Sequence, residues 1–596
     1  MTAMHFDAEG QQPPRLGLLI LQFCIYILFL LFALRLWYLQ VHKGDEYARL
    51  ARENQLRQDL VYAPRGLLRD RHGKLLAVNE PAYALGLVRE DCQDIKATLK
   101  KVSDWTGIEM AALEKKFDKG KRRVKPFEPL ILVPDISFDL LARIEANTLF
   151  WPGLEIVIRP RRVYPNGRIL SHILGFVAEA NEEELEKDAS LRLGDNVGKQ
   201  GLEFVLEQRL RGHKGLMQAE VDATGRFLNE KVVRKPEAGT NLSLSIDLDL
   251  QTLAASQLEG QSGAVVVLDA NSGQVLALVS EPGYDNNVFT GGISGPQWET
   301  LRDNPRHPLQ NRAMQSVYPP GSVWKVFMAG AGLHDGAITP SDTEFCSGEK
   351  RLGRHVFRCW KKHGHGRIAL KQAIAQSCDV YFYDLGEKLG VDKISDYAFK
   401  SGFGGKTGID LPHEKGGLVP TRDWKMKRFG EGWQGGENLN LAIGQGFTLV
   451  SPLQVARFMA AIANGGRLLK PTLLVDDLVE EQARLPFTDA ERQLLLDAMV
   501  ETVQGNHGTA RRLKSVDAQV GAKTGTAQVV KIAGEDRLDV NEMPYMHRDH
   551  AWLATWARKG DRAYSVVVMV EHGGHGGSAA GPMVQAIYKH IFGQAQ

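Results

Sequence analysis

A serine and a lysine three positions apart, Ser322 and Lys325, are the residues of this sequence best suited to covalent catalysis. Prolines and a glycine precede Ser322, and the apolar run 323–332 that follows predicts a helix beginning near the serine. Free N–H groups and the positive dipole end at a helix start favour an alkoxide or an oxyanion. Lys325 would lie on the same helix face, and a buried, cationic setting lowers a lysine pKa enough for it to act as a base. We therefore expect Ser322 to be a nucleophile.

Two further short motifs follow within a few hundred residues. A Ser-Cys-Asp tripeptide at 377–379 lies between two helix-like stretches, and a Lys-Thr-Gly-Thr tetrapeptide at 523–526 lies in a strand-like run. A strand there would let a ligand backbone pass closely at Gly525 and pair with a sheet edge. Lys523 and Thr524 could hold a carboxylate by charge-assisted hydrogen bonds.

Each motif taken alone has duplicates in this chain. Ser347 and Lys350 repeat the first, and Lys-Thr-Gly at 406–408 repeats the third. The first duplicate lies in a polar, turn-like segment, and the second lies among glycines that predict a helix stop and a turn. The ordered trio is therefore more specific than any of its members.

The three motifs in this order resemble the signature of the penicillin-binding proteins and class A β-lactamases. The resemblance extends over nearly the whole chain and is to class B penicillin-binding proteins of the cell-elongation branch. The segments similar to their transpeptidase domain are 318–325, 441–466 and 521–528, and those similar to their N-terminal pedestal are 63–79, 161–177 and 197–212.

The resemblance implies a two-step acyl transfer on peptidoglycan stem peptides. Ser322 would attack a D-Ala-D-Ala carbonyl, release the terminal D-Ala and pass the acyl group to an amino group of a neighbouring stem. Ser377 would relay a proton to the leaving group, and the N–H groups of Ser322 and Thr526 would form the oxyanion hole. β-Lactams would acylate the same serine. The implied catalytic residues are Ser322, Lys325, Ser377, Asp379 and Lys523, and the implied substrate-binding residues are Thr524, Gly525 and Thr526.

Asp379 departs from the family pattern, since most of the superfamily has Asn at this place. An amide can donate a hydrogen bond to a substrate carbonyl, whereas an ionised carboxylate cannot. The resemblance implies that Asp occurs here in the elongation branch.

Three cysteines and a histidine precede and enter the second motif. Cys346, Cys359, His365 and Cys378 are separated by 12, 5 and 12 residues. Three thiolates and an imidazole would suit a closed, structural zinc site, and elongation-type relatives resemble this chain in having metal ligands at comparable places. A Cys346–Cys359 disulfide in an oxidising exterior and buried, unreactive thiols are the alternatives, and His355 and His363 are rival ligands.

One long apolar run is placed to anchor these residues at a membrane. Leu16 to Leu34 comprises 19 residues without a charge, long enough to cross a bilayer. Arginines flank it, and no small-residue cleavage site follows it, so we expect an uncleaved signal-anchor over 16–36. Residues 1–15 would be a cytoplasmic tail, and the catalytic domain would lie in the periplasm.

The remaining sequence predicts two domains behind the anchor. A polar helix over 42–58 leads into mixed helix and strand patterns without a chemical motif, which predicts a pedestal domain over 45–245. Strand-like runs at 262–282 and 551–571 bracket helix-like stretches, which predicts one antiparallel sheet flanked by helices. We therefore expect an α+β transpeptidase domain over 260–592.

Composition and charge limit the possible partners. The chain has 596 residues, with 73 Lys and Arg against 71 Asp and Glu, so it lacks the basic field that attracts nucleic acid. The stretch after the anchor does not resemble a glycan polymerase, so the resemblance implies a SEDS-family glycosyltransferase and other elongation-complex proteins as partners. A serine D-Ala-D-Ala carboxypeptidase and a β-lactam-sensing module are the alternative functions.

Overall fold

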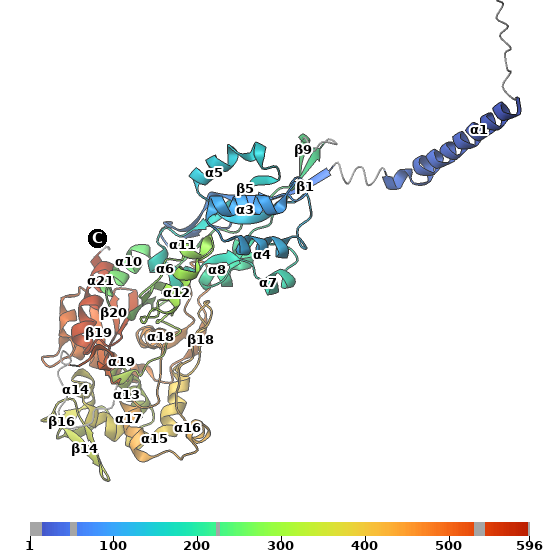
Figure 1. Ribbon diagram of the computed structural model, residues 1–596. Coiled ribbons are helices and arrows are strands. Elements are labelled where there is room, and N and C mark those ends of the chain that lie inside the picture. Colours follow the sequence, from blue (N-terminus) through green and yellow to red (C-terminus); the bar gives the residue numbers. More distant parts are fainter. Residues whose placement is uncertain (1–14, 48–55, 222–226, 530–542, 594–596) are drawn as a thin grey trace, which may run out of the picture. The chain divides into compact units, whose positions relative to one another are not determined.

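The computed structural model describes residues 15–47, 56–221, 227–529 and 543–593 (Figure 1). The chain forms two compact units. The first comprises Met1–Ala63 and His213–Glu237, and the second comprises Pro64–Gly212 and Ala238–Gln596.

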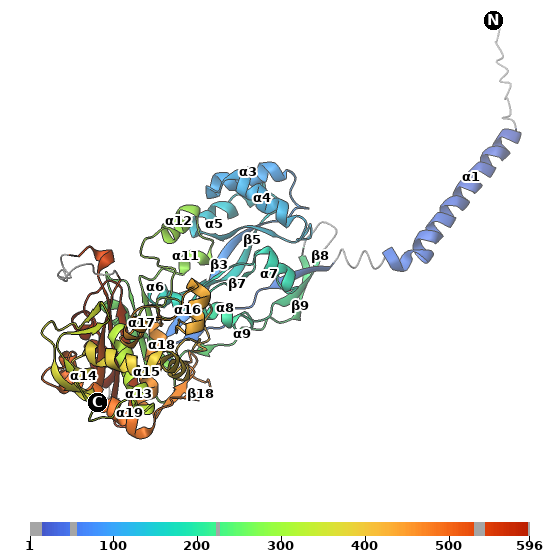
Figure 2. The same cartoon turned by 90° about the horizontal axis from the view of Figure 1, so that it is seen from below.

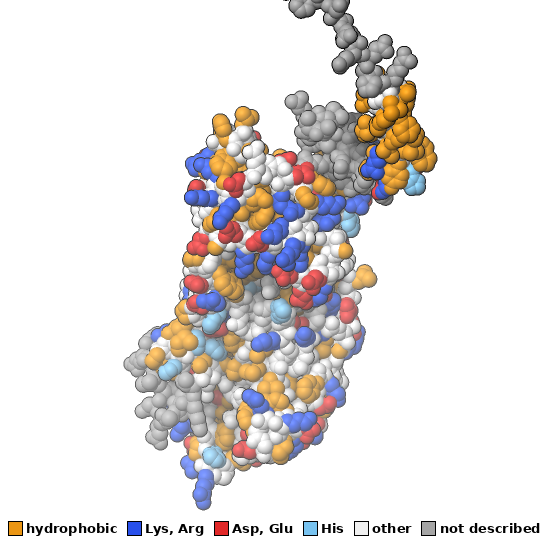
Figure 3. Space-filling view, turned by 45° about the vertical axis from the view of Figure 1, so that its right-hand side comes forward, with side chains coloured by type: hydrophobic (Ala, Val, Ile, Leu, Met, Phe, Trp, Pro, Cys, Tyr) orange, Lys and Arg blue, Asp and Glu red, His pale blue; other side chains and the backbone are white. Residues whose placement is uncertain are grey.

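The first unit contains the expected apolar helix. Its elements are α1 (Arg15–Trp37), the π-helical η1 (Tyr38–His42), β1 (Leu56–Val61), β8 (Gly215–Val221) and β9 (Phe227–Arg234). Exposed apolar side chains follow one another along α1, the face of which seen in Figure 3 is almost entirely apolar, and Leu16–His42 is long and apolar enough to cross a membrane. A helix over the predicted residues 16–36 is confirmed, and its length and composition make it a candidate membrane span.

The polar helix expected over 42–58 is only partly supported. Residues 44–47 are helical, and residues 48–55 lie outside the described part of the chain. The expectation is wrong for residues 56–58, because they belong to β1, which pairs antiparallel with β8. The backbone hydrogen bonds to a strand far along the chain outweigh the local polar pattern.

The second unit begins with a mixed helix and strand region, as expected of the pedestal. Strands β2, β3, β4 and β10 follow each other in the order β10-β2-β3-β4, and β5 also pairs with β3. The elements are β2 (Leu68–Arg69), β3 (Leu75–Leu87), α3 (Ile95–Thr106), α4 (Met110–Gly120), β4 (Leu130–Ile136), α5 (Phe138–Glu145), η2 (Thr148–Phe150), β5 (Leu154–Val163), α6 (Gly167–Leu174), β6 (Val177–Glu179), α7 (Glu182–Lys187), β7 (Asn196–Gly198), α8 (Gly201–Val205), α9 (Glu207–Leu210) and β10 (Leu242–Ser243).

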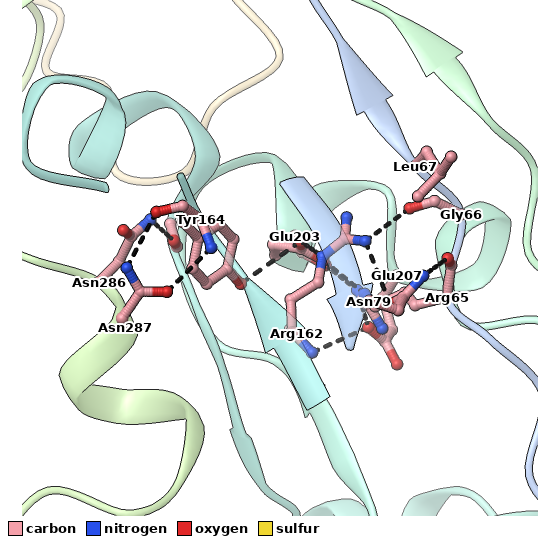
Figure 4. A network of polar contacts seen from close by, with 12 residues as sticks. Arg65, Gly66, Leu67, Asn79, Arg162, Tyr164, Glu203, Glu207, Asn286 and Asn287 are labelled. Carbon is pink, nitrogen blue, oxygen red and sulfur yellow. Dashed lines mark hydrogen bonds and ion pairs between the residues drawn. The ribbon is translucent and has the colours of Figure 1, made fainter. Parts of the chain in front are cut away.

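A buried ionic network holds this region together (Figure 4). The Glu203 carboxylate accepts hydrogen bonds from Arg65 and from Arg162 Nε at 2.6 Å. Burial alone would raise the pKa of Glu203, but the charges of Arg65 and Arg162 outweigh it and keep this pKa below its usual value. Removing one partner of such a buried pair costs about 3–5 kcal/mol, because the other charge stays buried.

The same network reaches the C-terminal part of the second unit. The Tyr164 hydroxyl donates to Glu203 Oε1 at 3.4 Å. The Asn287 side chain, on α11 (Asn287–Thr290), accepts from Tyr164 N and donates to Tyr164 O, each at 2.9 Å (Figure 4). This two-bond pairing fixes the end of β5 to the region that carries the chemical motifs.

The C-terminal region contains the predicted antiparallel sheet. Its strand order is β12-β11-β21-β20-β19, and every pair is antiparallel. The strands are β11 (Gly263–Asp269), β12 (Val275–Glu281), β19 (Gln519–Ala527), β20 (His550–Lys559) and β21 (Arg562–Val570). The strand-like runs expected at 262–282 and 551–571 are therefore confirmed, each as an antiparallel hairpin, and β19 is an edge strand.

Helices bury both faces of this sheet, which explains why its strands are almost continuously apolar. Val266 and Val567 belong to one core, whereas their neighbours Val265 and Val566 belong to another, as the two-residue repeat of a strand requires. Helix α18 (Pro452–Ala463) packs on the sheet within the first core, and α10 (Leu248–Gln257) and α21 (Gly581–Gly593) contribute to the second (Figure 1).

The remaining elements lie between the strands in sequence. Helices α13, α15 and α17 pack on one another (Figures 1 and 2). The antiparallel pair of β13 and β16 encloses, in sequence, a hairpin of β14 and β15, and together they form what we call the hairpin insertion (343–369). The elements are α12 (Gly295–Arg302), η3 (Gly321–Val323), α13 (Trp324–His334), β13 (Thr343–Cys346), β14 (Glu349–Leu352), β15 (His355–Arg358), β16 (Gly366–Ala369), α14 (Leu370–Ala375), α15 (Asp379–Lys400), α16 (Arg422–Phe429), α17 (Gly435–Ala442), β17 (Arg467–Leu469), β18 (Glu481–Arg484), α19 (Asp489–Gln504), η4 (Arg511–Ser515), η5 (Tyr545–His547) and α20 (Gly576–Ala579).

Candidate active site

Ser322 lies at the start of a helix, as its context predicts. It is in the 3-10 turn η3, which continues directly into α13. The preceding Gly321 has a left-handed φ of 55°, and its N–H donates to Gly444 O at 2.9 Å. A Cβ at position 321 would lie 2.6 Å from Thr526 O, so only glycine lets this turn approach the third motif so closely.

Lys325 is fully buried and links the first motif to the second. Its Nζ donates to Asp379 Oδ1 at 2.7 Å, to Ser377 O at 2.9 Å and more weakly to Ser377 Oγ at 3.4 Å. A neutral amine has two hydrogens and one lone pair. If the weak third donation is given up, the two short bonds use both hydrogens of the amine and leave its lone pair available to accept a proton.

Ser377 is held between two lysines. Lys523 Nζ donates to Ser377 Oγ at 2.8 Å, opposite the weaker bond from Lys325. Both contacts use lone pairs of the hydroxyl oxygen, so its hydrogen is free to point at a third group. The residue has a backbone φ of 58°, which residues other than glycine and asparagine rarely adopt. Backbone strain of this kind is common at functional sites.

Lys523 is fully buried on the edge strand β19. Besides Ser377, its Nζ donates to Thr524 O at 2.9 Å. Burial, and then the charge of Lys325, lower the pKa of Lys523 well below its usual value, and Asp379 only partly opposes them. The charge of Lys325 therefore disfavours the protonated form of Lys523.

The other residues of the third motif line the same strand. Thr524 Oγ1 bonds to Thr509 Oγ1 at 2.8 Å, and Thr526 O accepts from the Gln445 side chain at 3.3 Å. A Cβ on Gly525 would lie 2.9 Å from the Trp552 side chain and 3.0 Å from that of Val323. Glycine at 525 thus lets β19 pack directly on the turn that carries Ser322.

Asp379 is buried at the start of α15, and both of its carboxylate oxygens have donors. Oδ1 accepts from Lys325, and Oδ2 accepts from the backbone N–H of Trp360 at 2.8 Å. Trp360 lies in the hairpin insertion, between β15 and β16. The two bonds join the helix of the nucleophile, the second motif and the insertion.

The duplicate motifs lie elsewhere in different surroundings. Ser347 is in a turn of the hairpin insertion, where its hydroxyl donates to Glu349 O, and Lys350 pairs with Asp384 and Glu387. Thr407 lies in a loop and bonds to Glu414 by its N–H and its hydroxyl. The structure therefore separates the duplicates from the trio as the sequence context does.

The four predicted metal ligands come together. The Sγ atoms of Cys346, Cys359 and Cys378 and a ring nitrogen of His365 all lie within 4.8 Å of one another. His365 Nδ1 is 3.5 Å from Cys346 Sγ and 3.6 Å from Cys359 Sγ. Zinc bonds of about 2.3 Å to sulfur and 2.0 Å to nitrogen place tetrahedral ligands about 3.5 Å apart, so this set, the Cys/His cluster, fits the ion.

The thiols of the cluster are not cross-linked. All five cysteines of the chain lie within the described residues, and all five are free. The Cys346–Cys359 disulfide considered from the sequence is therefore not formed in this structure. A hydrogen bond from Cys378, with a second from His365, lowers the pKa of the Cys359 thiol despite burial, which favours the thiolate that a metal requires.

The sequence interpretation missed three residues of this site. Trp360 contributes only its backbone N–H to Asp379, and no side-chain motif signals such a bond. Gln445 contacts Thr526 from 81 residues away in the chain, and Thr509 contacts Thr524 from 15 residues away. Gln445 lies in a segment that resembles the family, and that is the signal that could have identified it.

Two family models match the chain. The model described as the penicillin binding protein transpeptidase domain matches residues 263–589, and the model described as the penicillin-binding protein dimerisation domain matches residues 60–244. A protein of Acinetobacter baumannii named peptidoglycan D,D-transpeptidase MrdA is 34% identical over 573 residues, covering 93% of this chain and 84% of that protein.

Solved structures of similar proteins agree with these matches. The complex between penicillin-binding protein 2 and MreC from Helicobacter pylori has a TM-score of 0.80 at 32% identity, covering 91% of this chain and 99% of that one. A structure described as structural coordination of polymerization and crosslinking by a peptidoglycan synthase complex has a TM-score of 0.71 at 30% identity, covering 98% and 99%. The resemblance to elongation-type class B enzymes is confirmed, and the carboxypeptidase alternative is not favoured.

Proposed function

The chain belongs to the penicillin-binding protein family as a peptidoglycan D,D-transpeptidase of cell-wall elongation, and we propose that it cross-links stem peptides through an acyl-enzyme on Ser322. The observation that supports this assignment best is the single buried set of bonds among Lys325, Ser377, Asp379 and Lys523. These residues come from three motifs far apart in sequence. Their arrangement next to a helix start suits acyl transfer at Ser322.

In the first step Ser322 Oγ bonds to the carbonyl carbon of the penultimate D-Ala, and the amide bond to the terminal D-Ala breaks. Lys325 accepts the Ser322 proton on its lone pair, and Ser377 relays it by giving its own hydrogen to the departing nitrogen and taking one from Lys325. The Ser377 hydroxyl suits this relay because its oxygen accepts from both lysines while its hydrogen stays free. The N–H groups of Ser322 and Thr526 stabilise the oxyanion.

In the second step an amino group of another stem attacks the ester carbonyl. The ester bond to Ser322 breaks, the new amide forms, and the proton lost by the amine returns to Ser322 Oγ. In the first step, before the terminal D-Ala departs, Lys523 and Thr524 hold its carboxylate, for which a buried lysine on an edge strand is suited. β-Lactams carry a comparable carboxylate and acylate Ser322 in the same way.

Cross-linking by the full chain in liposomes tests this proposal, with uncross-linked glycan bearing pentapeptide stems as substrate. We expect wild-type protein to release one D-Ala for each cross-link, and Ser322→Ala to lose at least about a thousandfold in rate. Ser347→Ala is the matched control and should keep the wild-type rate, because the Ser347 hydroxyl donates to Glu349 O within its own turn. D-Ala release without cross-links would contradict transpeptidation, and cross-linking by Ser322→Ala would contradict the nucleophile.

We propose in addition that the Cys/His cluster binds one structural zinc ion. The ligands would be Cys346, Cys359, His365 and Cys378, whose separations and donor types suit the ion. Four protein ligands leave no open position, so the ion would brace the hairpin insertion against the second motif and take no part in bond making. Cys378 lies inside that motif, between Ser377 and Asp379.

We also propose a membrane topology and partners. Helix α1 would anchor the chain in the cytoplasmic membrane, with residues 1–15 in the cytoplasm and the second unit in the periplasm. The similarity to a protein solved with MreC, and to a peptidoglycan synthase complex that couples polymerization to crosslinking, supports elongation-complex partners. A SEDS-family glycosyltransferase would supply the glycan.

A further inference from the structure

Asp379 stands where most of the superfamily has Asn, and its two bonds give a reason. Lys325 Nζ and the N–H of Trp360 approach opposite oxygens of one buried carboxylate, at 2.7 and 2.8 Å. Both approaching groups are donors. A carboxylate accepts from both, whereas an amide would turn its own N–H groups toward one of them. The residue type at 379 is therefore matched to a donor in the hairpin insertion.

Trp360 is fixed from three directions. It follows Cys359 directly in the chain, its indole N–H donates to Gln376 O at 3.0 Å, and its ring packs edge-on against His365 at 5.6 Å. Two of these neighbours belong to the Cys/His cluster, and the third immediately precedes Ser377. The residue is 52% exposed, so burial contributes little to its position.

The backbone of the insertion holds the same geometry. The N–H of Cys359 donates to Gly348 O at 2.8 Å, and that of His365 donates to Cys346 O at 3.1 Å. The segment 359–365, which contains the Trp360 N–H, is thus held at both ends by backbone hydrogen bonds of the cluster residues Cys359 and His365. Opening the cluster would release this segment and leave Asp379 Oδ2 buried without its donor.

We infer that Trp360 is a positioning residue for the acyl transfer. Its N–H fixes the Asp379 carboxylate, which in turn orients Lys325, so the closed Cys/His cluster sets the geometry of the proposed base. The inference rests on the acyl-enzyme proposed for Ser322, and it explains why position 379 carries Asp. It assigns the hairpin insertion a part in catalysis through hydrogen bonding alone.

A cycle of variants tests the inference by the rate of acylation of the full chain with a fluorescent penicillin. In the wild-type background, the amide of Asp379→Asn turns its N–H groups toward a second donor, either Lys325 Nζ or the N–H of Trp360. We therefore expect Asp379→Asn to lose at least tenfold in rate. Trp360→Pro removes the N–H and Trp360→Ala keeps it, so the proline variant should be at least tenfold slower than the alanine variant. In the Trp360→Pro background, the introduced amide can turn its oxygen toward Lys325, and Asp379→Asn should then cost less than threefold.

Hydrogen exchange at the Trp360 amide gives a readout independent of activity. Removing metal with a chelator should raise its exchange rate at least tenfold, while the amides of α13 keep theirs. The inference would be overturned if Asp379→Asn were acylated at the wild-type rate, or if the losses of the two single variants multiplied fully in the double variant. It would also be overturned if the exchange rate of the Trp360 amide stayed unchanged after metal removal. A wild-type protein whose Ser322 is never acylated would instead contradict the proposed function.

Discussion

Lys523 is the lysine of the site whose pKa is lowered by its surroundings. Burial and the neighbouring Lys325 disfavour its ammonium form, so its pKa lies well below the usual 10.5. Since the pKa in the folded state is depressed, protonating Lys523 costs stability at low pH, and this penalty disappears as pH rises toward the unfolded value. A ligand carboxylate placed beside the ammonium would oppose the shift.

The pH dependence of acylation follows from this sign. At low β-lactam concentration the acylation rate depends on the pKa values of the free enzyme. The alkaline limb of the pH–rate profile should then lie well below pH 10.5, where Lys523 loses its proton. At saturating β-lactam the ligand carboxylate stabilises the ammonium, so the limb should move to higher pH. Stopped-flow acylation over both concentration ranges checks this.

Lys523→Arg is the matched variant for that measurement, because its guanidinium keeps its charge throughout the range. Its profile should lack the alkaline limb that Lys523 causes. Coincident limbs at low and saturating β-lactam would show that Lys523 does not bind the carboxylate.

The side-chain motifs predicted most of the residues of the site, whereas the backbone geometry of the site could not be predicted from the sequence. Order and context singled out the three motifs, and the family resemblance implied the catalytic set of Ser322, Lys325, Ser377, Asp379 and Lys523, whose roles stay predictions. The left-handed φ of Ser377 and the N–H of Trp360 depend on how the insertion packs, which no local pattern encodes.

Among the elements, the Cys/His cluster offers a direct measurement. Purified wild-type protein should contain about one zinc ion per chain, since its four donors fit one tetrahedral ion. Cys346→Ser should lose that ion and melt at a lower temperature. Cys92→Ser is the control, because Cys92 contacts Thr98 in the pedestal region and lies outside the cluster. Elemental analysis measures the zinc content of each variant, and thermal unfolding measures its melting temperature.

The outcome that would contradict a metal site is equally plain. A fully active protein without metal, or equal zinc in Cys346→Ser and Cys92→Ser, would leave the cluster as buried thiols. Titration of free thiols under oxidising conditions would reveal a Cys346–Cys359 disulfide, which this structure does not contain.

Element patterns were predictable where burial imposes a repeat. The four strands at 262–282 and 551–571 are apolar because both sheet faces are covered, and they were found nearly at their bounds. Residues 56–58 were misassigned to a helix because β1 is defined by its partner β8, about 160 residues later in the chain. Pairing at such a distance leaves no signal in a local window.

For the whole molecule, the two compact units divide anchoring from chemistry. The first unit carries the apolar α1, and the second carries all the residues of the candidate site. Within the second unit the Glu203 network and the Tyr164–Asn287 pairing connect the pedestal region to the catalytic region. The domain bounds expected from the sequence, 45–245 and 260–592, remain predictions.

The central claim is that Ser322 forms the acyl-enzyme. The most direct measurement is to incubate the full chain with a penicillin, digest it and locate the covalent adduct by tandem mass spectrometry. We predict one penicilloyl group per chain on Ser322, at the start of α13. An adduct on Ser347 or Ser377, or a chain that stays unmodified at saturating penicillin, would contradict the account.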